Sequence, residues 1–463
     1  MKRQPNHPPF STVSDDALGD LDAVGLIESI QSGSVHPDEL TAAALARAQL
    51  AQEALNAVVT WEPNPKAGNG PFGGIPSFVK DNEDVAGLPS REGSRAIPDT
   101  PKAVHSEFVS QYVDLGFTVL GKSTLPEFGL TATTEPLLGG PTRNPWNTEH
   151  STGGSSGGAS ALVAAGVTPI AHANDGGGSI RIPAACCGVV GLKPTRGRVV
   201  GKEEEEKLPV NITANGVVTR SVRDTALFYS ELEKLHAPPG LPPIGHVTSP
   251  GSRRLRIGVL LEGMSGFPVA AEVQETVQAT AATCEDLGHH VEVIPFPFDE
   301  QFGRDFLRYW AGLAFAIQYG GKQMFGEGFD RSQLEPLTLG LGRFFRTVAL
   351  RTPTTLRRLR QFGDQYEQVF ESYDVLLSPV LSHTPPPIGY LSPALDFNTH
   401  LVRLLRYASF TAVQNVSGAP AISLPLGFSE DGLPIGVQAS AGFGQEARLL
   451  ELALELEEAM PWR

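Results

Sequence analysis

The segment from Ser151 to Thr195 constrains this chain more than any other, because it places two serines inside glycine-rich runs. Ser155 follows two glycines and is separated from two more by Ser156, and Ser179 follows three consecutive glycines, 24 residues later (179 − 155). Glycine lets a backbone approach a bound molecule closely and turn its N–H groups toward it. Upstream, Lys80 closes a short apolar segment. A serine nucleophile needs a proton acceptor and anion-stabilising backbone groups, and these residues can provide both without a histidine.

Six sequence blocks, in one order along the chain, resemble those of the amidase signature family. The resemblance covers nearly the whole chain and is weak only from 236 to 372. The DGGGSIRIPA and NVSGAPA segments are closer to bacterial amidases of the 6-aminohexanoate-cyclic-dimer hydrolase type than to fatty acid amide hydrolases. The blocks are GIPSFVKDNEDVAGLPSREGS, GKSTLPEFG, GPTRNPWN, the two-serine segment, NGVVTRSVRDTAL and FTAVQNVSGAPAISLP.

The resemblance implies a single α/β domain over residues 1–463, with a mixed central β-sheet covered by helices on both faces. Residues 66–235 would hold the catalytic blocks, and the divergent residues 236–372 would supply much of the substrate pocket. No linker-like composition divides the chain. Six phenylalanines of the divergent region hint at an apolar acyl or aryl group, although core packing accounts for most such residues. They are Phe302, Phe306, Phe315, Phe325, Phe344 and Phe345.

Local patterns agree with such a sheet. Strands alternate with helices, the 255–294 region reads as a βαβ unit with parallel strands, and Glu430-Asp431-Gly432 predicts a hairpin near the C-terminus. Alternation of strands and helices favours helices on both faces of the sheet. The predicted strands are 75–80, 117–120, 167–171, 255–261, 291–294, 421–426 and 435–439, and the predicted helices are 37–55, 159–165, 269–287 and 446–460.

The resemblance assigns roles to the three polar residues. Ser179 matches the family's nucleophile, Ser155 the relay serine that follows a cis peptide bond, and Lys80 the final base. A lysine in water has a pKa of about 10.4, which makes it a poor base at neutral pH. Burial can lower that pKa by ~3–5 units. We therefore expect a neutral, buried Lys80 that is hydrogen-bonded to Ser155.

Backbone groups near the serines complete the expected site. The amides of Gly176, Gly177 and Gly178 would bind the developing oxyanion, although the family commonly has Thr or Ile at the first of these positions. Gly129 and Thr131 would form a wall of the acyl pocket. Asp175 and Arg181 would brace the nucleophile loop rather than bind substrate.

Composition limits the partners. Lys and Arg number 36 against 51 Asp and Glu, a formal charge of −15, which disfavours nucleic acid and other polyanions. The basic run Arg343 to Arg360 reads as a solvated helix face, and the acidic run Glu203 to Glu206 as an exposed loop. No apolar stretch suggests a secretory leader or membrane span. An odd count of three cysteines favours a reducing compartment, so we expect a cytoplasmic protein. Cys187 is expected to be a small buried hydrophobe rather than a nucleophile.

No histidine spacing suggests a metal site, and we expect no cofactor; His172 reads as a core residue beside the site. The expected partner is a small-molecule amide, and the oligomeric state stays open, with a homodimer as one expectation. The sequence therefore predicts an amidase that hydrolyses C–N bonds of linear or cyclic carboxamides through an acyl-enzyme.

Besides the amidase, two other enzyme functions stay open, an esterase and a glutaminase subunit. A non-catalytic binding protein on the same fold is a further alternative. Residues 153–157 match the G-x-S-x-G elbow of α/β-hydrolases, which would make Ser155 the nucleophile of an esterase. Against this, the preceding residues TEHSTGG do not read as a strand, and Asp374 and His383 lie only nine residues apart. The third possibility is the glutaminase subunit of a tRNA-dependent amidotransferase. Those relatives carry an acidic residue near the position of Tyr407-Ala408-Ser409, where this chain has none.

Overall fold

The central sheet of the protein is mixed, as predicted. The computed structural model describes residues 7–462, and in them eight strands form one sheet. Three neighbouring strands at one end are parallel, and the remaining pairs are antiparallel. In order across the sheet, the strands are β10 (His290–Val293), β9 (Arg256–Val259), β11 (Val375–Pro379), β13 (Pro434–Ser440), β12 (Ala421–Phe428), β7 (Val190–Lys193), β8 (Ala214–Thr219) and β6 (Ile170–Asp175).

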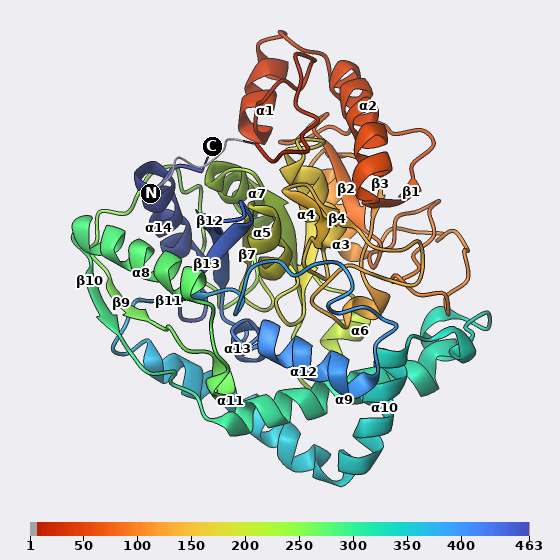
Figure 1. The fold of residues 1–463 in the computed structure, drawn as a ribbon. Coiled ribbons are helices and arrows are strands. Elements are labelled where there is room, and N and C mark those ends of the chain that lie inside the picture. Colours follow the sequence, from red (N-terminus) through yellow and green to blue (C-terminus); the bar gives the residue numbers. More distant parts are fainter. Residues whose placement is uncertain (1–6, 463) are drawn as a thin grey trace.

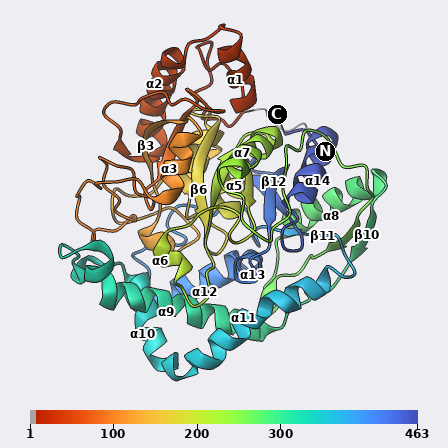
Figure 2. The ribbon, with the colours of Figure 1, turned by 180° about the vertical axis from the view of Figure 1, so that it is seen from behind.

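Helices cover both faces of this sheet (Figures 1 and 2). Neighbouring strand residues point to opposite faces, which β8 illustrates. Val217 packs in the large core with α7 and α14, whereas Val218 packs in a separate cluster with α4 and α5. The helices are α1 (Ala23–Gln31), α2 (Pro37–Leu55), α3 (Glu107–Asp114), α4 (Gly157–Ala164), α5 (Arg181–Cys187), α6 (Glu203–Glu206), α7 (Val222–Leu235), α8 (Ala271–Asp286), α9 (Glu300–Phe325), α10 (Pro336–Val348), α11 (Thr352–Val369), α12 (Phe397–Tyr407), α13 (Ala412–Ser417) and α14 (Glu446–Ala459).

Two smaller sheets lie beside the main one. In the first, β3 (Thr118–Ser123) lies between β1 (Val58–Trp61) and β2 (Pro76–Lys80). The second pairs β4 (Arg143–Asn144) with β5 (Asn147–Ser151). Strand β2 runs next to β6, because Ser77 Oγ donates to the Ile170 carbonyl and the Lys80 amide donates to His172 Nδ1. This contact places the end of β2 beside the end of β6, where the glycine loop starts.

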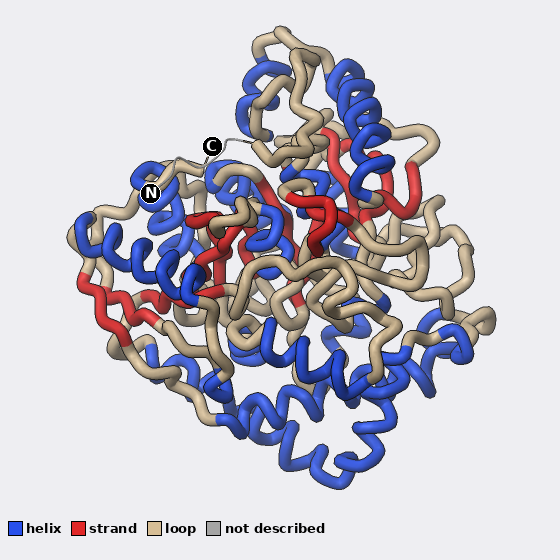
Figure 3. The backbone as a smooth tube through the Cα atoms, viewed as in Figure 1, coloured by secondary structure: helices blue, strands red, loops and turns tan. Residues whose placement is uncertain are grey.

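Helices α9, α10 and α11 form a separate layer along one side of the molecule, outside the strands (Figures 1 and 3). All three helices belong to the divergent residues 236–372. Helix α9 is 26 residues long, and several of its side chains reach the cavity described below. Within residues 7–462, no helix combines the length and apolarity that crossing a bilayer requires.

Most local predictions are confirmed. Helix α2 spans the predicted residues 37–55, since Pro37 occupies its first turn and Glu39 accepts a hydrogen bond from the His36 amide. Strands β9 and β10 are parallel, and β12 and β13 form the predicted hairpin. The predicted strand 167–171 was misplaced. Strand β6 begins at Ile170 and continues to Asp175, because contacts at the site bury the polar residues at its end.

Candidate active site

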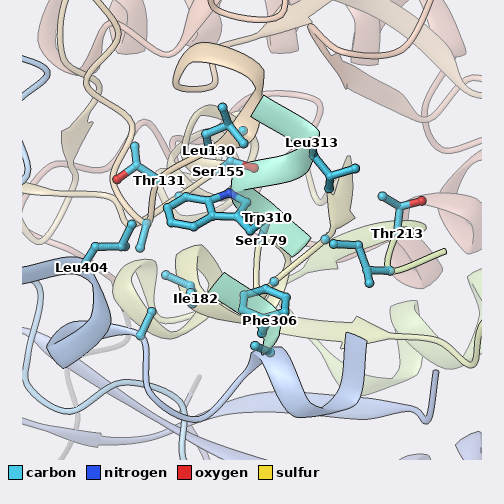
Figure 4. A pocket seen from close by; sticks show the side chains of 18 of the residues that line it. Leu130, Thr131, Ser155, Ser179, Ile182, Thr213, Phe306, Trp310, Leu313 and Leu404 are labelled. Carbon is cyan, nitrogen blue, oxygen red and sulfur yellow. The ribbon is translucent and has the colours of Figure 1, made fainter. Parts of the chain in front are cut away.

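One cavity of about 410 Å³ contains all three residues of the predicted relay. Figure 4 shows Ser155 and Ser179 behind Trp310, with Thr213 at one side and Thr131 and Leu404 at the other. The cavity therefore extends in two directions from the two serines.

Lys80 is the last residue of β2, and its side chain is fully buried. Its Nζ lies 2.7 Å from Ser155 Oγ and 2.6 Å from Asn174 Oδ1. Burial lowers the pKa of the Lys80 ammonium from 10.5 to about 7, although Glu92 and other carboxylates oppose this shift. A substantial fraction of Lys80 is therefore a neutral amine at pH 7, which a proton-accepting role requires.

Ser155 lies in the loop between β5 and α4, after a cis peptide bond from Gly154. Two glycines beside it leave little room for a side chain. A Cβ on Gly154 would lie 2.8 Å from the Thr133 carbonyl, and one on Gly129 would lie 3.0 Å from Ser155 Oγ. Ser155 itself is 2% exposed and lines the cavity. Its hydroxyl is thus held against Lys80 by close backbone packing.

Ser179 lies in the loop between β6 and α5 and is 9% exposed, and Gly176 and Gly177 of the same loop also line the cavity. The Gly178 amide donates to Asp175 Oδ1 at 2.7 Å, so it is already occupied. The oxyanion role expected of the Gly178 amide is therefore not available to it, and the expectation stays with the amides of Gly176 and Gly177. Gly178 serves the turn itself, since its φ is +128°.

Asp175 and Arg181 brace this loop, as the sequence led us to expect. Their side chains are fully buried, and Arg181 Nη2 lies 3.0 Å from Asp175 Oδ1. Although burial alone would raise it, Arg181 holds the pKa of Asp175 well below its usual range. Arg181 also donates to side chains of Gln414, Asn415 and Gln438, contacts that the sequence did not reveal. These bonds connect the loop to α13 and β13.

Gly129 and Thr131 both lie in the cavity wall, where the resemblance places them. Thr131 Oγ1 is 3.1 Å from His400 Nε2 on α12. Of the six phenylalanines considered above, Phe306 lines the cavity, and the other five pack in cores or on one another. The side with Thr131 is otherwise apolar. Its further lining includes Leu130, Ile182, Trp310, Leu404 and Leu405.

The other side of the cavity, where Thr213 and Leu313 lie in Figure 4, also carries charged and polar side chains that the sequence analysis missed. Glu205 on α6 lines it, although we expected an exposed loop for this acidic run. The Lys202 amide donates to its carboxylate, which turns the side chain inward. Lys202 Nζ lies 3.6 Å from Glu92 Oε1, and burial raises the pKa of Glu92 to about 7. A run of four glutamates gives no sign that one of them faces a cavity.

Residues proposed for other roles have structural contacts. His172 is fully buried against the Lys80 amide, and burial lowers its pKa to about 3. Cys187 is fully buried, and burial raises the pKa of its thiol well above the ordinary value. Most arginines of the 343–360 run are exposed, as expected for a solvated face, and Arg358 pairs with Asp305.

The structure disfavours the esterase alternative for a reason other than the one expected from the sequence. A short strand, β5, does precede Ser155, contrary to the prediction, because it pairs with β4 outside the main sheet. The nucleophile-elbow interpretation is disfavoured because Ser155 Oγ is hydrogen-bonded to Lys80 and not to a histidine. The His383 ring packs on Tyr407 and Tyr390 instead.

Comparisons with known proteins point to one family. The profile of the amidase family matches residues 39–450. A Mycobacterium leprae (strain TN) protein named "Putative amidase AmiC" is 48% identical over 455 residues, 97% of each chain. The 6-aminohexanoate-cyclic-dimer hydrolase of Pseudomonas sp. (strain NK87) is 35% identical and covers 95% of each chain. The solved structure of 6-aminohexanoate cyclic dimer hydrolase complexed with substrate has a TM-score of 0.86 and 32% identity, and the match covers 96% of this chain and 98% of that one.

The chain belongs to the amidase family. It is an enzyme that hydrolyses amides, with the mixed sheet and flanking helices of its structural neighbours.

Proposed function

We propose that this amidase cleaves small linear or cyclic carboxamides through Ser179, Ser155 and Lys80. The observation that carries the proposal is the buried Lys80 amine, 2.7 Å from Ser155 Oγ in the cavity that also contains Ser179. A lysine with a pKa near 7 can accept a proton, whereas one at its ordinary pKa cannot do so at neutral pH.

In the first half-reaction, Ser179 Oγ attacks the amide carbon as its proton passes to Ser155, whose own proton passes to Lys80. The negative charge on the substrate oxygen is then stabilised by the amides of Gly176, Gly177 and Ser179. The C–N bond breaks as Lys80 returns the proton through Ser155 to the leaving nitrogen. Water then attacks the ester by the same relay, which releases the acid and restores Ser179.

The two sides of the cavity suggest how a substrate lies. The leaving nitrogen must face Ser155 and Lys80, because it receives their proton. Lys80 lies with Asn82, Glu92 and Glu205 on the polar side. The acyl group would then extend to the apolar side, along Trp310 and Leu404. We therefore propose a substrate with an apolar acyl group and a polar or cationic amine product. We also propose that the chain acts without a partner subunit. Since all three cysteines are free thiols, we place it in a reducing cytoplasm.

A hydrolysis screen tests this function. The purified chain alone should release amine from short aliphatic, aryl and cyclic amides, including the cyclic dimer of 6-aminohexanoate. Ser179→Ala and Lys80→Ala should each reduce kcat by at least ~10³-fold. Activity that appears only with a partner protein and glutamine would instead support the amidotransferase alternative.

A further inference from the structure

A second side chain holds Lys80 besides Ser155. Asn174 is the penultimate residue of β6, is 8% exposed and lines the cavity. Its Oδ1 accepts from Lys80 Nζ at 2.6 Å. The backbone of Asn174 is fixed in turn, since Ser156 Oγ donates to its carbonyl at 3.2 Å. Among the described residues, the two hydrogen-bond partners of Lys80 Nζ are therefore a hydroxyl and an amide, and both are uncharged.

The chemistry of a neutral amine explains why this matters. It has two N–H groups and one lone pair, and it acts as a base only where the lone pair points. An acceptor that takes one N–H removes a rotational freedom of the amine. Ser155 Oγ lies 2.7 Å from Nζ, within reach of the lone pair that must take its proton.

Charged groups near Lys80 are engaged elsewhere. Asp175 is paired with Arg181, and Glu92 with Lys202. The Glu83 carboxylate accepts from Ser106 and Asn215. Glu205 accepts from the Lys202 amide. On the cationic side, Lys122 is paired with Asp81. An aspartate in place of Asn174 would thus be the first carboxylate bonded directly to Nζ, and it would hold the lysine as an ammonium.

We propose that Asn174 is a positioning residue of the reaction, whose uncharged Oδ1 directs the Lys80 lone pair at Ser155 without fixing a proton on the amine. The inference rests on the proposed function. It extends the relay by a residue whose side chain bonds the base, Lys80.

Two substitutions at this position make opposite predictions. Asn174→Asp places a negative charge on Nζ, so the acid limb of kcat/KM should move up by ~1–3 pH units. Asn174→Ala removes an acceptor that stabilises the ammonium, so the limb should move down. Loss of orientation should also lower kcat by ~10²-fold at every pH, with KM nearly unchanged. A merely structural role would lower activity without shifting the limb in opposite directions.

Asn211→Asp is the matched control, because it makes the same chemical change in a loop near the cavity. The Asn211 side chain accepts from Thr213 and does not contact Lys80. In this variant the acid limb of kcat/KM should lie at the same pH as in the unchanged enzyme. If both Asn174 variants leave the limb in place or move it in one direction, the inference is wrong.

Should Asn174→Asp fail to fold, as thermal unfolding would show, Asn174→Ser provides the second comparison. Its hydroxyl keeps an acceptor, so its limb should lie above that of Asn174→Ala, and identical limbs would overturn the proposal. The variant Lys80→Ala distinguishes a failure of the proposed function from a failure of the inference on Asn174. Full activity in that variant would refute the proposed function, whereas an inactive Lys80→Ala with unmoved Asn174 limbs would refute this inference alone.

Discussion

Asp175 and Arg181 form a fully buried ion pair that also sets the shape of the nucleophile loop. Arg181 bonds both carboxylate oxygens, Nη2 to Oδ1 at 3.0 Å and Nε to Oδ2 at 3.0 Å. The same oxygens accept from the amides of Gly178 and Ile180, on either side of Ser179. We therefore expect both stability and catalysis to depend on this pair of side chains.

Asp175→Asn should destabilise the protein strongly. Removing one partner of a buried ion pair leaves an uncompensated charge and typically costs ~3–5 kcal/mol. Urea unfolding at pH 7 measures the change, with the exposed Asp364→Asn as a control expected within ~0.5 kcal/mol of the parent. The pKa of Asp175 is lower in the folded chain, so its contribution is present above the unfolded pKa of about 3.9 and is lost as pH falls below that value. A cost that does not shrink below pH 4 would contradict the assignment.

The glycine loop gives a sharp steric contrast. A Cβ on Gly178 would lie 2.4 Å from Thr411 Oγ1 and 2.7 Å from Ile182 Cδ1, at a φ of +128°. A Cβ on Gly177 would meet only Phe306 Cζ, at 3.6 Å. Gly178→Ala should therefore lose ~1–3 kcal/mol of stability and at least ~10²-fold in kcat, whereas Gly177→Ala should unfold like the parent. Equal unfolding midpoints for the two variants would show that the loop is not packed as described.

Activity should require the neutral form of Lys80. Since burial lowers its pKa to about 7, kcat/KM should rise as pH increases through about 7 and then level off. A pH–rate profile on a neutral amide measures this limb. A flat profile between pH 6 and 9, together with full activity in Lys80→Ala, would remove Lys80 from the mechanism.

The same pKa affects stability. The unfolded chain binds a proton on Lys80 up to its ordinary pKa of 10.5, whereas the folded chain releases it near 7. Stability of the parent should therefore rise relative to Lys80→Met by ~1.4 kcal/mol per pH unit between these values. Thermal unfolding of both proteins from pH 7 to pH 10 tests the trend. A constant difference in Tm would mean that Lys80 stays protonated when folded.

The apolar side of the cavity should select the acyl group. Trp310 on α9 lines the cavity, whereas Phe315 on the same helix packs against Tyr319 and Phe345 instead. Trp310→Ala should lower kcat/KM for an amide with a long apolar acyl group by ~10-fold or more, because it removes ~1–3 kcal/mol of contact with that acyl group. The loss for acetamide should be much smaller. Phe315→Ala is the control and should leave this ratio unchanged. Equal losses for both amides would place the acyl group elsewhere.

Much of this arrangement could be predicted from the sequence. Lys80, Ser155 and Ser179 lie in sequence blocks that resemble those of the amidase signature family, and the structure brings them to one cavity. The remaining contacts of the site join residues that lie far apart in the sequence. Arg181 bonds Asn415, 234 residues away, and no local pattern reports such a partner.

Two of the wrong predictions have related causes. Strand β6 was placed too early because His172 and Asn174 are polar, yet contacts with Lys80 bury them both. Glu205 was assigned to the surface because its neighbours are acidic, yet it lines the cavity. Polar residues at an active site follow the chemistry of the site rather than the hydrophobic pattern of the fold.

The identity of the attacking hydroxyl decides the whole account. Reaction with a fluorophosphonate, followed by digestion and mass spectrometry, shows which serine carries the adduct. We predict a single adduct on Ser179, absent in Ser179→Ala and formed much more slowly in Lys80→Ala. An adduct on Ser155 that persists in Ser179→Ala would contradict the relay and make Ser155 the nucleophile.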